Sequence, residues 1–452
     1  MKLPSSAHKR YLGGADWCLA TLNHGTRETT GRRATFHVAV LLAGAPDADR
    51  MESGFRTFCE RFPVLWGALA RCWCLAPYWK YPPSPDPTAI SVTRSSLPAG
   101  ASREEVVRWM EARANAREPL RGCAVSFHIL RIGEAEGALG FSFDHHLFDA
   151  GGAERFIDLF FRFLNGEARA GDFPEGRPTA PARLDGWIRR FLNAHRVRQW
   201  MRRLGDPSAA ALPLPGDASR RPFRFRVASF GEEDSRRVKD RAFEVAGYLM
   251  FMPYVLATAA AAFGPFFRKR SAPDAQFVVS VSTDKPKGMA VHAPHFFFND
   301  LSFLYFNFPP AAGDDRNALA GALREQLIAQ VKDELPAAVE DANLLMRILP
   351  VATFWKFLMH LYRNQLASFA FTCLGTPALK TAAVLGCPVR GHLHLPIIPT
   401  PPGIGLILSR SGGAYHAVLS YIEGILPEDE IDALMESFRA KLLDAPVRAE
   451  KG

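Results

Sequence analysis

Alternating apolar and polar residues predict strands in the first third of the chain. Residues 34–44 ("ATFHVAVLLAG"), 123–133 ("CAVSFHILRIG") and 137–146 ("GALGFSFDHH") have the period of two that is expected of half-buried strands. The polar turn "GEAE" separates the last two runs, which predicts an antiparallel pair. In the third run, every second residue from Leu139 to His145 would share one inward face.

Helical spacing replaces this alternation after Gly152. Apolar residues recur at helical intervals from Ala153 to Leu164, which predicts an amphipathic helix over 153–164. The polar positions between them are Glu154, Arg155, Asp158 and Arg162. A strand is therefore expected to run into a turn and then into a helix.

The second half of the chain has the same mixture of patterns. Strands are expected over 223–230, 276–286 and 296–308, and a terminal hairpin over 401–426 with its turn at "SRSGG". Helices are expected over 315–334 and 427–445. The fold class indicated is mixed α/β, with a first half over 1–170 and a second over 223–452.

One uncharged run resembles a membrane span. Residues 245–267 ("VAGYLMFMPYVLATAAAAFGPFF") are long enough to cross a bilayer, and three basic residues follow them. Two prolines and a glycine interrupt the run, and its four consecutive alanines suit close helix packing. We therefore favour a buried helix of a large domain over a membrane span.

Residues 171–222 read as a linker that contains a basic amphipathic helix at 184–205. Arginines surround an apolar face made of Leu184, Trp187, Ile188, Phe191 and Leu192 and extended by Trp200, Met201 and Leu204. Such a helix can lie on an anionic membrane, or it can pack on a domain with its arginines in solvent. The second interpretation is the one we favour.

Length and charge allow many functions. A chain of 452 residues can form two domains with large cores, and its net charge of +9 favours anionic partners in general. These include a nucleotide-bearing cofactor, an acidic carrier protein and a lipid headgroup. The seven cysteines contain no CxxC pair, and no signal peptide is apparent, which indicates reduced thiols in a cytoplasmic protein.

The candidate chemistry lies in "FDHHLFDAGG". His145, at the end of a strand, could act as a general base, because an ordinary histidine is largely neutral at physiological pH. Asp149 could cap the following helix, and Gly151 and Gly152 would permit close approach. No serine or cysteine nucleophile stands in a recognisable turn, which favours direct attack. A histidine with its hydrogen bonds satisfied in an ordinary turn remains an open alternative.

A metal site is a further interpretation of the same residues. It would use His145, His146 and Asp149 as ligands. Adjacent strand residues point to opposite faces, so the two histidines do not easily share one ion. We therefore expect no metal at this turn.

The sequence resembles the coenzyme A-dependent acyltransferase superfamily. "DHHLFDAGG" resembles its H-x-x-x-D motif, and "RYLGGADWCLAT", "MESGFRTFCERFPVLWGAL" and "EPLRGCAVSFHIL" resemble the segments before it. "VSVSTDKPKG" and "FFFNDLSF" resemble the matching region of the second half. The superfamily includes chloramphenicol acetyltransferase, plant alcohol acyltransferases, wax ester synthases and condensation domains of peptide synthetases. The segments occur in the family's order over nearly the whole chain.

The resemblance implies two chloramphenicol acetyltransferase-like domains in one chain, with a tunnel between them and His145 at its middle. His145 would be the base, and Asp149 would be structural, paired with a cation of the second half. Lys285 stands where the family usually has arginine. Asn299 matches the family's asparagine near the tunnel. His146, Gly151 and Gly152 would support the site, and no metal is implied.

The activity implied is transfer of an acyl group from acyl-CoA or an acyl carrier protein to a hydroxyl or amine. The thioester would be a co-substrate, and no permanently bound cofactor is expected. The expected partners are a small-molecule or lipid acceptor and, as one form of the donor, a separate carrier protein, with no nucleic acid. Two halves in one chain favour a monomer. The alternatives are a catalytically silent binding module and a lipid acyltransferase at the membrane surface.

Overall fold

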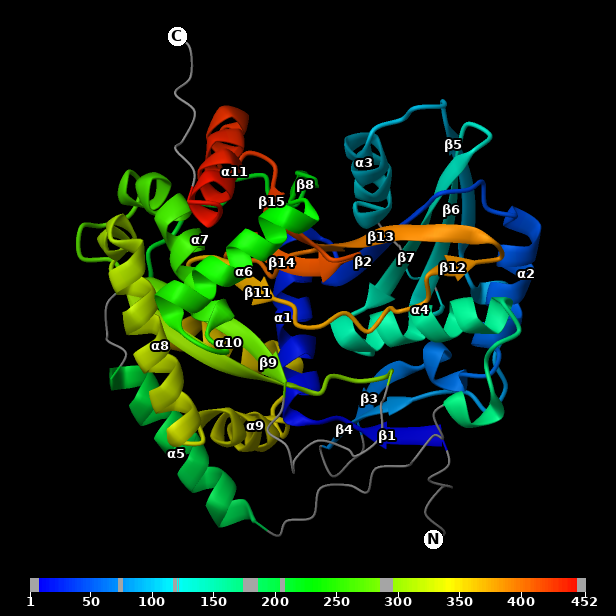
Figure 1. Cartoon of the computed structure of the whole chain (residues 1–452). Helices are drawn as coiled ribbons and strands as arrows, with labels where there is room; N and C mark the ends of the chain where they lie inside the picture. The colour runs from blue at the N-terminus through cyan, green and yellow to red at the C-terminus, as the bar shows by residue number, and fades with distance from the viewer. Residues whose placement is uncertain are drawn as a thin grey trace, which may run out of the picture.

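The computed structural model describes residues 8–71, 76–116, 120, 122–173, 186–203, 208–284 and 296–444. The chain is mixed α/β, as the sequence predicts (Figure 1). Its helices are α1 (Gly14–Thr30), α2 (Ala48–Cys59), α3 (Arg103–Ala114), α4 (Ala150–Leu164), α5 (Trp187–Arg203), α6 (Glu232–Ala246), α7 (Phe251–Arg268), α8 (Arg316–Lys332), α9 (Leu335–Met346), α10 (Val351–Leu361) and α11 (Glu428–Leu442).

Across the residue ranges given above, the strands form two six-stranded sheets and one of three strands. The first large sheet has the order β12 (Ala383–Val384), β13 (Cys387–Pro396), β2 (Thr35–Leu42), β7 (Glu136–Asp144), β6 (Val125–Ile132), β5 (Val92–Leu97). The second has the order β10 (Leu301–Phe308), β9 (Phe277–Asp284), β11 (Ala370–Cys373), β14 (Ile404–Ser411), β15 (Ala414–Ile422), β8 (Phe223–Ser229). The small sheet has the order β1 (Lys9–Tyr11), β4 (Pro77–Lys80), β3 (Ala68–Arg71).

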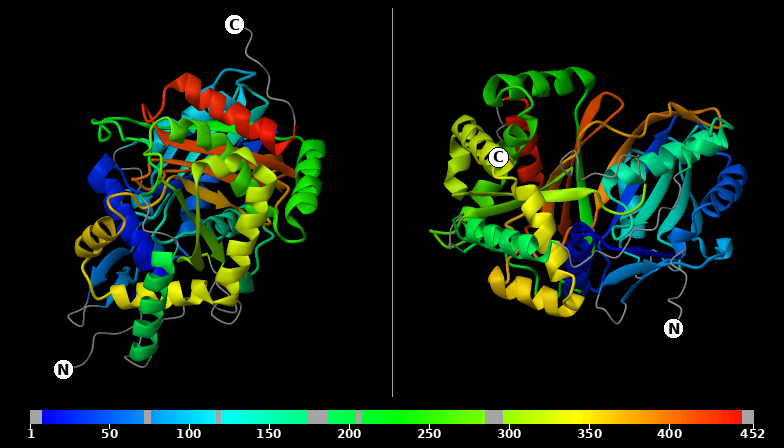
Figure 2. Two further views of the ribbon diagram at one scale, coloured as in Figure 1. Left: turned by 90° about the vertical axis from the view of Figure 1, so that its left-hand side faces the viewer. Right: turned by 90° about the horizontal axis from the view of Figure 1, so that it is seen from below.

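The predicted antiparallel pair is present, since β6 and β7 pair from Val125↔Phe143 to Ile132↔Glu136. The first sheet also receives β13 from the second half of the chain, which pairs with β2. β13 lies against β14 and β15 of the second sheet, so one apolar core joins the two sheets. Figure 2 shows the two sheets and the orange strands that connect them from two further sides.

Aromatic packing explains why α2 and α4 cover the outer face of the first sheet. Phe141 and Phe143 point to this face from β7, as the alternation predicts, and Phe55 of α2 stacks on Phe127 of β6 at 4.6 Å between ring centroids. Phe160 of α4 meets Phe55 edge to face at 5.0 Å. Offset and edge-to-face pairs of this kind add about 0.5–1.5 kcal/mol each beyond their buried area.

The uncharged run forms a buried helix, as expected. Most of α7 is buried in the core of the second half, against α8 and α11. α6 ends at Ala246 and α7 begins at Phe251, so the run 245–267 is not one continuous helix. Among the described residues, no single helix is long and apolar enough to cross a membrane; α6 and α7 pass that test only as a pair bent by 97°.

The basic helix is present as α5, and the predicted apolar face packs only in part. α5 lies on α9, where Asn193 donates a hydrogen bond to Asp341, and Trp200, in the predicted extension of the apolar face, meets Tyr305 of β10. The earlier part of that face is exposed: Trp187, Ile188, Phe191 and Leu192 are 42%, 76%, 62% and 57% exposed. Leu184 and Leu204 lie outside the described residues.

Two expectations around α4 are wrong in detail. The helix begins at Ala150, three residues earlier than predicted. Glu154, predicted as a polar surface position, is 5% exposed because His392 and His394 of β13 meet its carboxylate. The described cysteines Cys18, Cys59, Cys123, Cys373 and Cys387 are all free thiols, as expected.

Candidate active site

The candidate site is the turn between β7 and α4. β7 ends at Asp144, whose carbonyl accepts hydrogen bonds from the main-chain N–H groups of Leu147 and Phe148 and so closes the turn. His145 therefore stands in a turn and not on the strand face predicted for it. Asp149 is the N-cap of α4, and its Oδ1 accepts a hydrogen bond of 2.6 Å from the N–H of Gly152. This cap fixes where the helix begins.

Residues 296–300, a segment of the second half, contact this turn through hydrogen bonds and a β-bridge. Asp149 Oδ2 accepts a hydrogen bond of 3.2 Å from the N–H of Asp300. The N–H of Phe298 donates to the carbonyl of Leu147 at 2.5 Å. Phe148 and Phe298 form a parallel bridge. The turn is therefore fixed by contacts between the two halves of the molecule, made by the main chain and by the Asp149 carboxylate.

Gly152 permits this contact. A Cβ built on Gly152 would lie 2.4 Å from the carbonyl oxygen of Phe296, whereas a Cβ on Gly151 would meet nothing closer than 3.5 Å. The close approach therefore requires glycine only at position 152, although the sequence predicts that both Gly151 and Gly152 permit one.

Asn299 connects three parts of the site. Its Nδ2 donates to the carbonyl of His145 at 3.0 Å and to Asp16 Oδ1 at 3.2 Å. Its main-chain N–H donates to the same Asp16 oxygen at 2.9 Å. Asp16 lies in the first turn of α1 and Asn299 is 4% exposed. The amide side chain therefore positions the main chain of His145 without contacting its ring.

His146 is fully engaged in hydrogen bonds. Asn23 Oδ1 accepts the N–H of Ala34, so its Nδ2 donates to His146 Nε2 at 3.2 Å. That arrangement leaves the ring proton on Nδ1, which donates to Asp144 Oδ1 at 2.6 Å. Both ring nitrogens are therefore occupied, and His146 supports the turn.

The interaction between Asp144 and His146 shifts the pKa values of both side chains. Burial alone would raise the pKa of Asp144, but His146 and the neighbouring Arg33 lower it to about 2. Burial lowers the pKa of His146, yet the carboxylate of Asp144 outweighs it and raises the pKa above its ordinary value. The carboxylate of Asp144 thus orients the ring of His146.

His145 differs from its neighbour in having free ring nitrogens. Its Nδ1 is buried and makes no hydrogen bond to any described residue, and its ring meets Phe36 edge to face at 5.1 Å. The residue as a whole is partly exposed, and no hydrogen bond from the described part of the chain engages Nε2. Burial lowers the pKa of His145, against opposing contributions from its own carbonyl and from Asp149. The ring is therefore neutral at physiological pH and able to accept a proton.

The predicted cation for Asp149 lies outside the described residues, because Lys285 belongs to the segment 285–295. In the part of the chain that the structure describes, the contacts of Asp149 are main-chain N–H groups. In the same part of the chain, His145, His146 and Asp149 do not converge as a set of metal ligands.

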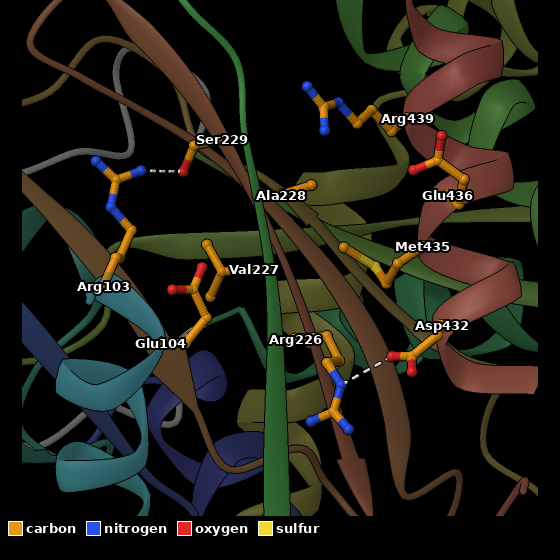
Figure 3. A pocket seen from close by; sticks show the side chains of 10 residues that line it. All are labelled: Arg103, Glu104, Arg226, Val227, Ala228, Ser229, Asp432, Met435, Glu436 and Arg439. Carbon is orange, nitrogen blue, oxygen red and sulfur yellow. Dashed lines mark hydrogen bonds and ion pairs between the residues drawn. The ribbon is translucent and has the colours of Figure 1, made fainter. Parts of the chain in front are cut away.

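A groove lies elsewhere between the halves, with a cavity volume of 610 Å³ (Figure 3). Arg103 and Glu104 of α3 line one side, and residues of β8 and α11 line the other. Its charged residues balance, three arginines against three carboxylates: Arg103, Arg226, Arg439, Glu104, Asp432 and Glu436. His145 does not line this groove.

Some supporting residues have no recognisable sequence signal. Asn23 lies on α1, and Glu340 of α9 accepts hydrogen bonds from the N–H groups of Gly14 and Ala15 at the start of α1. These contacts join residues more than 100 positions apart in the chain. A single sequence does not reveal such pairs, since neither partner belongs to a local motif.

Comparison with known proteins identifies the fold. No family model and no curated protein matches the sequence. Among solved structures, the trichothecene 15-O-acetyltransferase TRI3 of Fusarium sporotrichioides is similar with a TM-score of 0.70 at 13% identity, covering 98% of this chain and 96% of that one. The first condensation domain of the calcium-dependent antibiotic synthetase has a TM-score of 0.68 at 16% identity, covering 98% of each chain.

A third structure, the condensation domain of the monacolin K polyketide synthase MokA, has a TM-score of 0.63 at 11% identity and covers 96% of this chain and 97% of that one. At identities this low, the likeness establishes the fold and not the activity.

Proposed function

We propose that this chain, which has the fold of the coenzyme A-dependent acyltransferase superfamily, is an acyltransferase. It moves an acyl group from a thioester to a hydroxyl or amine acceptor, with His145 as general base. The observation that carries the proposal is the contrast between the two adjacent histidines. His146 has both ring nitrogens occupied, whereas His145 has a lowered pKa and makes no ring hydrogen bond to the described residues.

The proposed reaction is direct attack. The proton of the acceptor passes to His145 Nε2 while the acceptor oxygen or nitrogen attacks the carbonyl carbon of the thioester. The tetrahedral intermediate collapses, the carbon–sulfur bond breaks, and the thiolate takes the proton from the imidazolium. A base positioned in this way contributes about 10²–10⁴ in rate. Asn299 and Asp149 act through the main chain of the turn, by holding His145 in place.

The donor is acyl-CoA or the thioester of a separate acyl carrier protein, and the acceptor is a small molecule or a lipid. Both donors are anionic, which suits a chain of net charge +9. The proposal includes a tunnel that brings donor and acceptor to His145 from opposite sides. It needs no permanently bound cofactor and no nucleic acid, and it is consistent with a monomeric cytoplasmic protein.

The test compares His145→Gln with His146→Gln. Thiol release and acylated products are measured over a panel of acyl-CoA and phosphopantetheine thioesters with alcohol and amine acceptors. We expect His145→Gln to lose about 10²–10⁴ in turnover, and His146→Gln to lose less, because it only supports the turn. Full turnover by His145→Gln would exclude it as the base. Donor binding by the wild type without turnover across the whole panel would identify a silent binding module instead.

α5 favours a second version of the function, acyl transfer to a lipid at a membrane surface. Its apolar side chains Trp187, Ile188, Phe191 and Leu192 are exposed on a helix that contains arginines and no carboxylate. Arg189 beside them is 70% exposed despite its ion pair with Asp341. Helices with one apolar and one basic face bind anionic lipid surfaces.

This version is tested by sedimentation with phosphatidylserine-containing vesicles at low salt. The double variant Ile188→Ser, Phe191→Ser is compared with Phe243→Ser, which removes an equally exposed aromatic side chain from α6. We expect the wild type and Phe243→Ser to sediment with the vesicles and the double variant to stay in solution. A wild type that stays in solution would exclude the membrane version and leave the soluble one.

A further inference from the structure

Three buried side chains, Glu154, His392 and His394, meet between α4 and β13. They take no part in the proposed acyl-transfer chemistry. Glu154 comes from α4, about one and a half turns after the cap residue Asp149. His392 and His394 come from one face of β13, which crosses from the second half of the chain to pair with β2. All three are between 3% and 5% exposed.

The ligand atoms lie close to the geometry of a metal site. Glu154 Oε1 lies 3.1 Å from His392 Nε2 and 2.7 Å from His394 Nε2, and all three atoms lie within 4.8 Å of one another. Ligands that bind zinc at about 2.0–2.1 Å in a tetrahedron are separated by about 3.3 Å. The two carboxylate–imidazole separations would therefore have to lengthen by about 0.2 and 0.6 Å to admit an ion, with the two imidazole nitrogens brought to a similar separation.

Outer hydrogen bonds hold two of the three ligands. Glu154 Oε2 accepts the N–H of Ala378, which leaves Oε1 for the ion. His392 Nδ1 lies 2.9 Å from the hydroxyl of Ser411, which also accepts the main-chain N–H of His392 at 2.7 Å. The Ser411 hydroxyl can accept a hydrogen bond from Nδ1 as well as donate one to it. It is therefore compatible with the His392 tautomer that carries its proton on Nδ1 and has a free lone pair on Nε2. Such outer partners are typical of metal-ligating histidines and carboxylates.

The electrostatics of the cluster also favour a cation. Within the described residues, no arginine or lysine forms an ion pair with the Glu154 carboxylate. A buried carboxylate is costly unless it is paired or binds a metal. A divalent ion would supply a countercharge for this carboxylate.

We propose that Glu154, His392 and His394 bind one divalent transition-metal ion, for which Zn²⁺ is the best match to a buried set of two histidines and one carboxylate. The three protein ligands leave one tetrahedral position for a water molecule. The ion would link α4 to β13 and so connect the helix that begins at the candidate site with the strand that joins the two halves. Its role is structural, and the inference does not depend on the acyltransferase proposal.

The experiment measures metal binding by the full-length chain under reducing conditions. The protein is stripped with a chelator, titrated with Zn²⁺ against a chromophoric competitor, and loaded with Co²⁺ to record its visible absorption. We expect one Zn²⁺ per chain, a Co²⁺ spectrum of a site with nitrogen and oxygen ligands, and a higher melting temperature with Zn²⁺.

Variants locate the site. Glu154→Gln and His394→Gln are expected to lose stoichiometric binding, and Ser411→Ala is expected to weaken it by about 10–100-fold. His416→Gln is the matched control, since His416 is a buried histidine of β15 bonded to Ser229 outside the cluster. Circular dichroism checks that each variant is folded.

Two results would overturn the proposal. The first is a wild-type chain that neither binds Zn²⁺ nor changes its melting temperature. The second is binding that is undiminished in both Glu154→Gln and His394→Gln, which would place the metal elsewhere. If the ligand variants do not fold, the Co²⁺ spectrum of the wild type decides, because thiolate charge-transfer bands would assign the metal to cysteines and refute the site.

Discussion

Replacing Gly152 with alanine tests the contact that joins the two halves at the turn. The new Cβ would lie 2.4 Å from the carbonyl oxygen of Phe296, where ordinary contact begins at 3.4 Å. The two atoms must therefore separate by roughly 1 Å, and overpacking of this kind costs about 1–3 kcal/mol. Main-chain atoms on both sides leave no flexible side chain to absorb the shift.

The shift would also stretch the neighbouring hydrogen bonds. Asp300 donates to Asp149 at 3.2 Å and Phe298 donates to Leu147 at 2.5 Å, and each bond contributes about 1 kcal/mol. The better helix propensity of alanine offsets about 0.5–1 kcal/mol. The net expectation is a local destabilisation of about 1–3 kcal/mol.

Gly151→Ala is the matched control. Its Cβ would meet only the end of the Arg155 side chain at 3.5 Å, so we expect a neutral effect or a gain of about 0.4–1 kcal/mol. Hydrogen exchange by mass spectrometry is measured on peptides covering 145–156 and 296–301. Exchange should be about 5–150-fold faster in Gly152→Ala and unchanged or slower in Gly151→Ala. Equal exchange in the two variants would refute the close approach of the segment 296–300.

The other two predictions concern the supports of the histidines. Asn299→Ala should lower kcat at nearly unchanged KM, because it frees the main chain of His145 and leaves substrate contacts intact; a change in KM alone would contradict the positioning role. Asp144→Asn should lower the pKa of His146, measured by NMR titration, because it removes the carboxylate that raises it. Since the folded-state pKa of His146 is raised, the pair stabilises the wild type fully below about pH 6.5 and loses this contribution as the pH rises through the folded pKa. Asp144 acts in the opposite sense, since its contribution is present above about pH 4 and is lost as the pH falls through about 2. Asp144→Asn should therefore flatten the pH dependence of the melting temperature above pH 6.5, and an unchanged pKa of His146 would refute the pairing.

The sequence predicts the elements whose pattern is local. The pattern predicts β2, β6 and β7. One face of each strand packs against aromatic side chains, and apolar residues therefore alternate along its sequence. The cap at Asp149 is recognisable for the same reason, since the cap and the N–H that it accepts lie three residues apart.

Contacts between residues far apart in the chain cannot be predicted from such local patterns. Glu154 looks like a surface residue of an amphipathic helix, because its histidine partners stand 238 and 240 positions further along the chain. His145 looks like a strand residue, because the alternation continues into a turn that Asp144 closes. The predicted partner of Asp149, Lys285, stays a prediction, since it lies outside the described residues.

The pH dependence of kcat/KM tests the role of His145 most directly. The account predicts that activity falls on the acid side with an apparent pKa below 6.5, because the buried ring must be neutral to accept a proton. The residual activity of His145→Gln should lack this fall. An identical acid limb and an undiminished rate in His145→Gln would contradict the central claim.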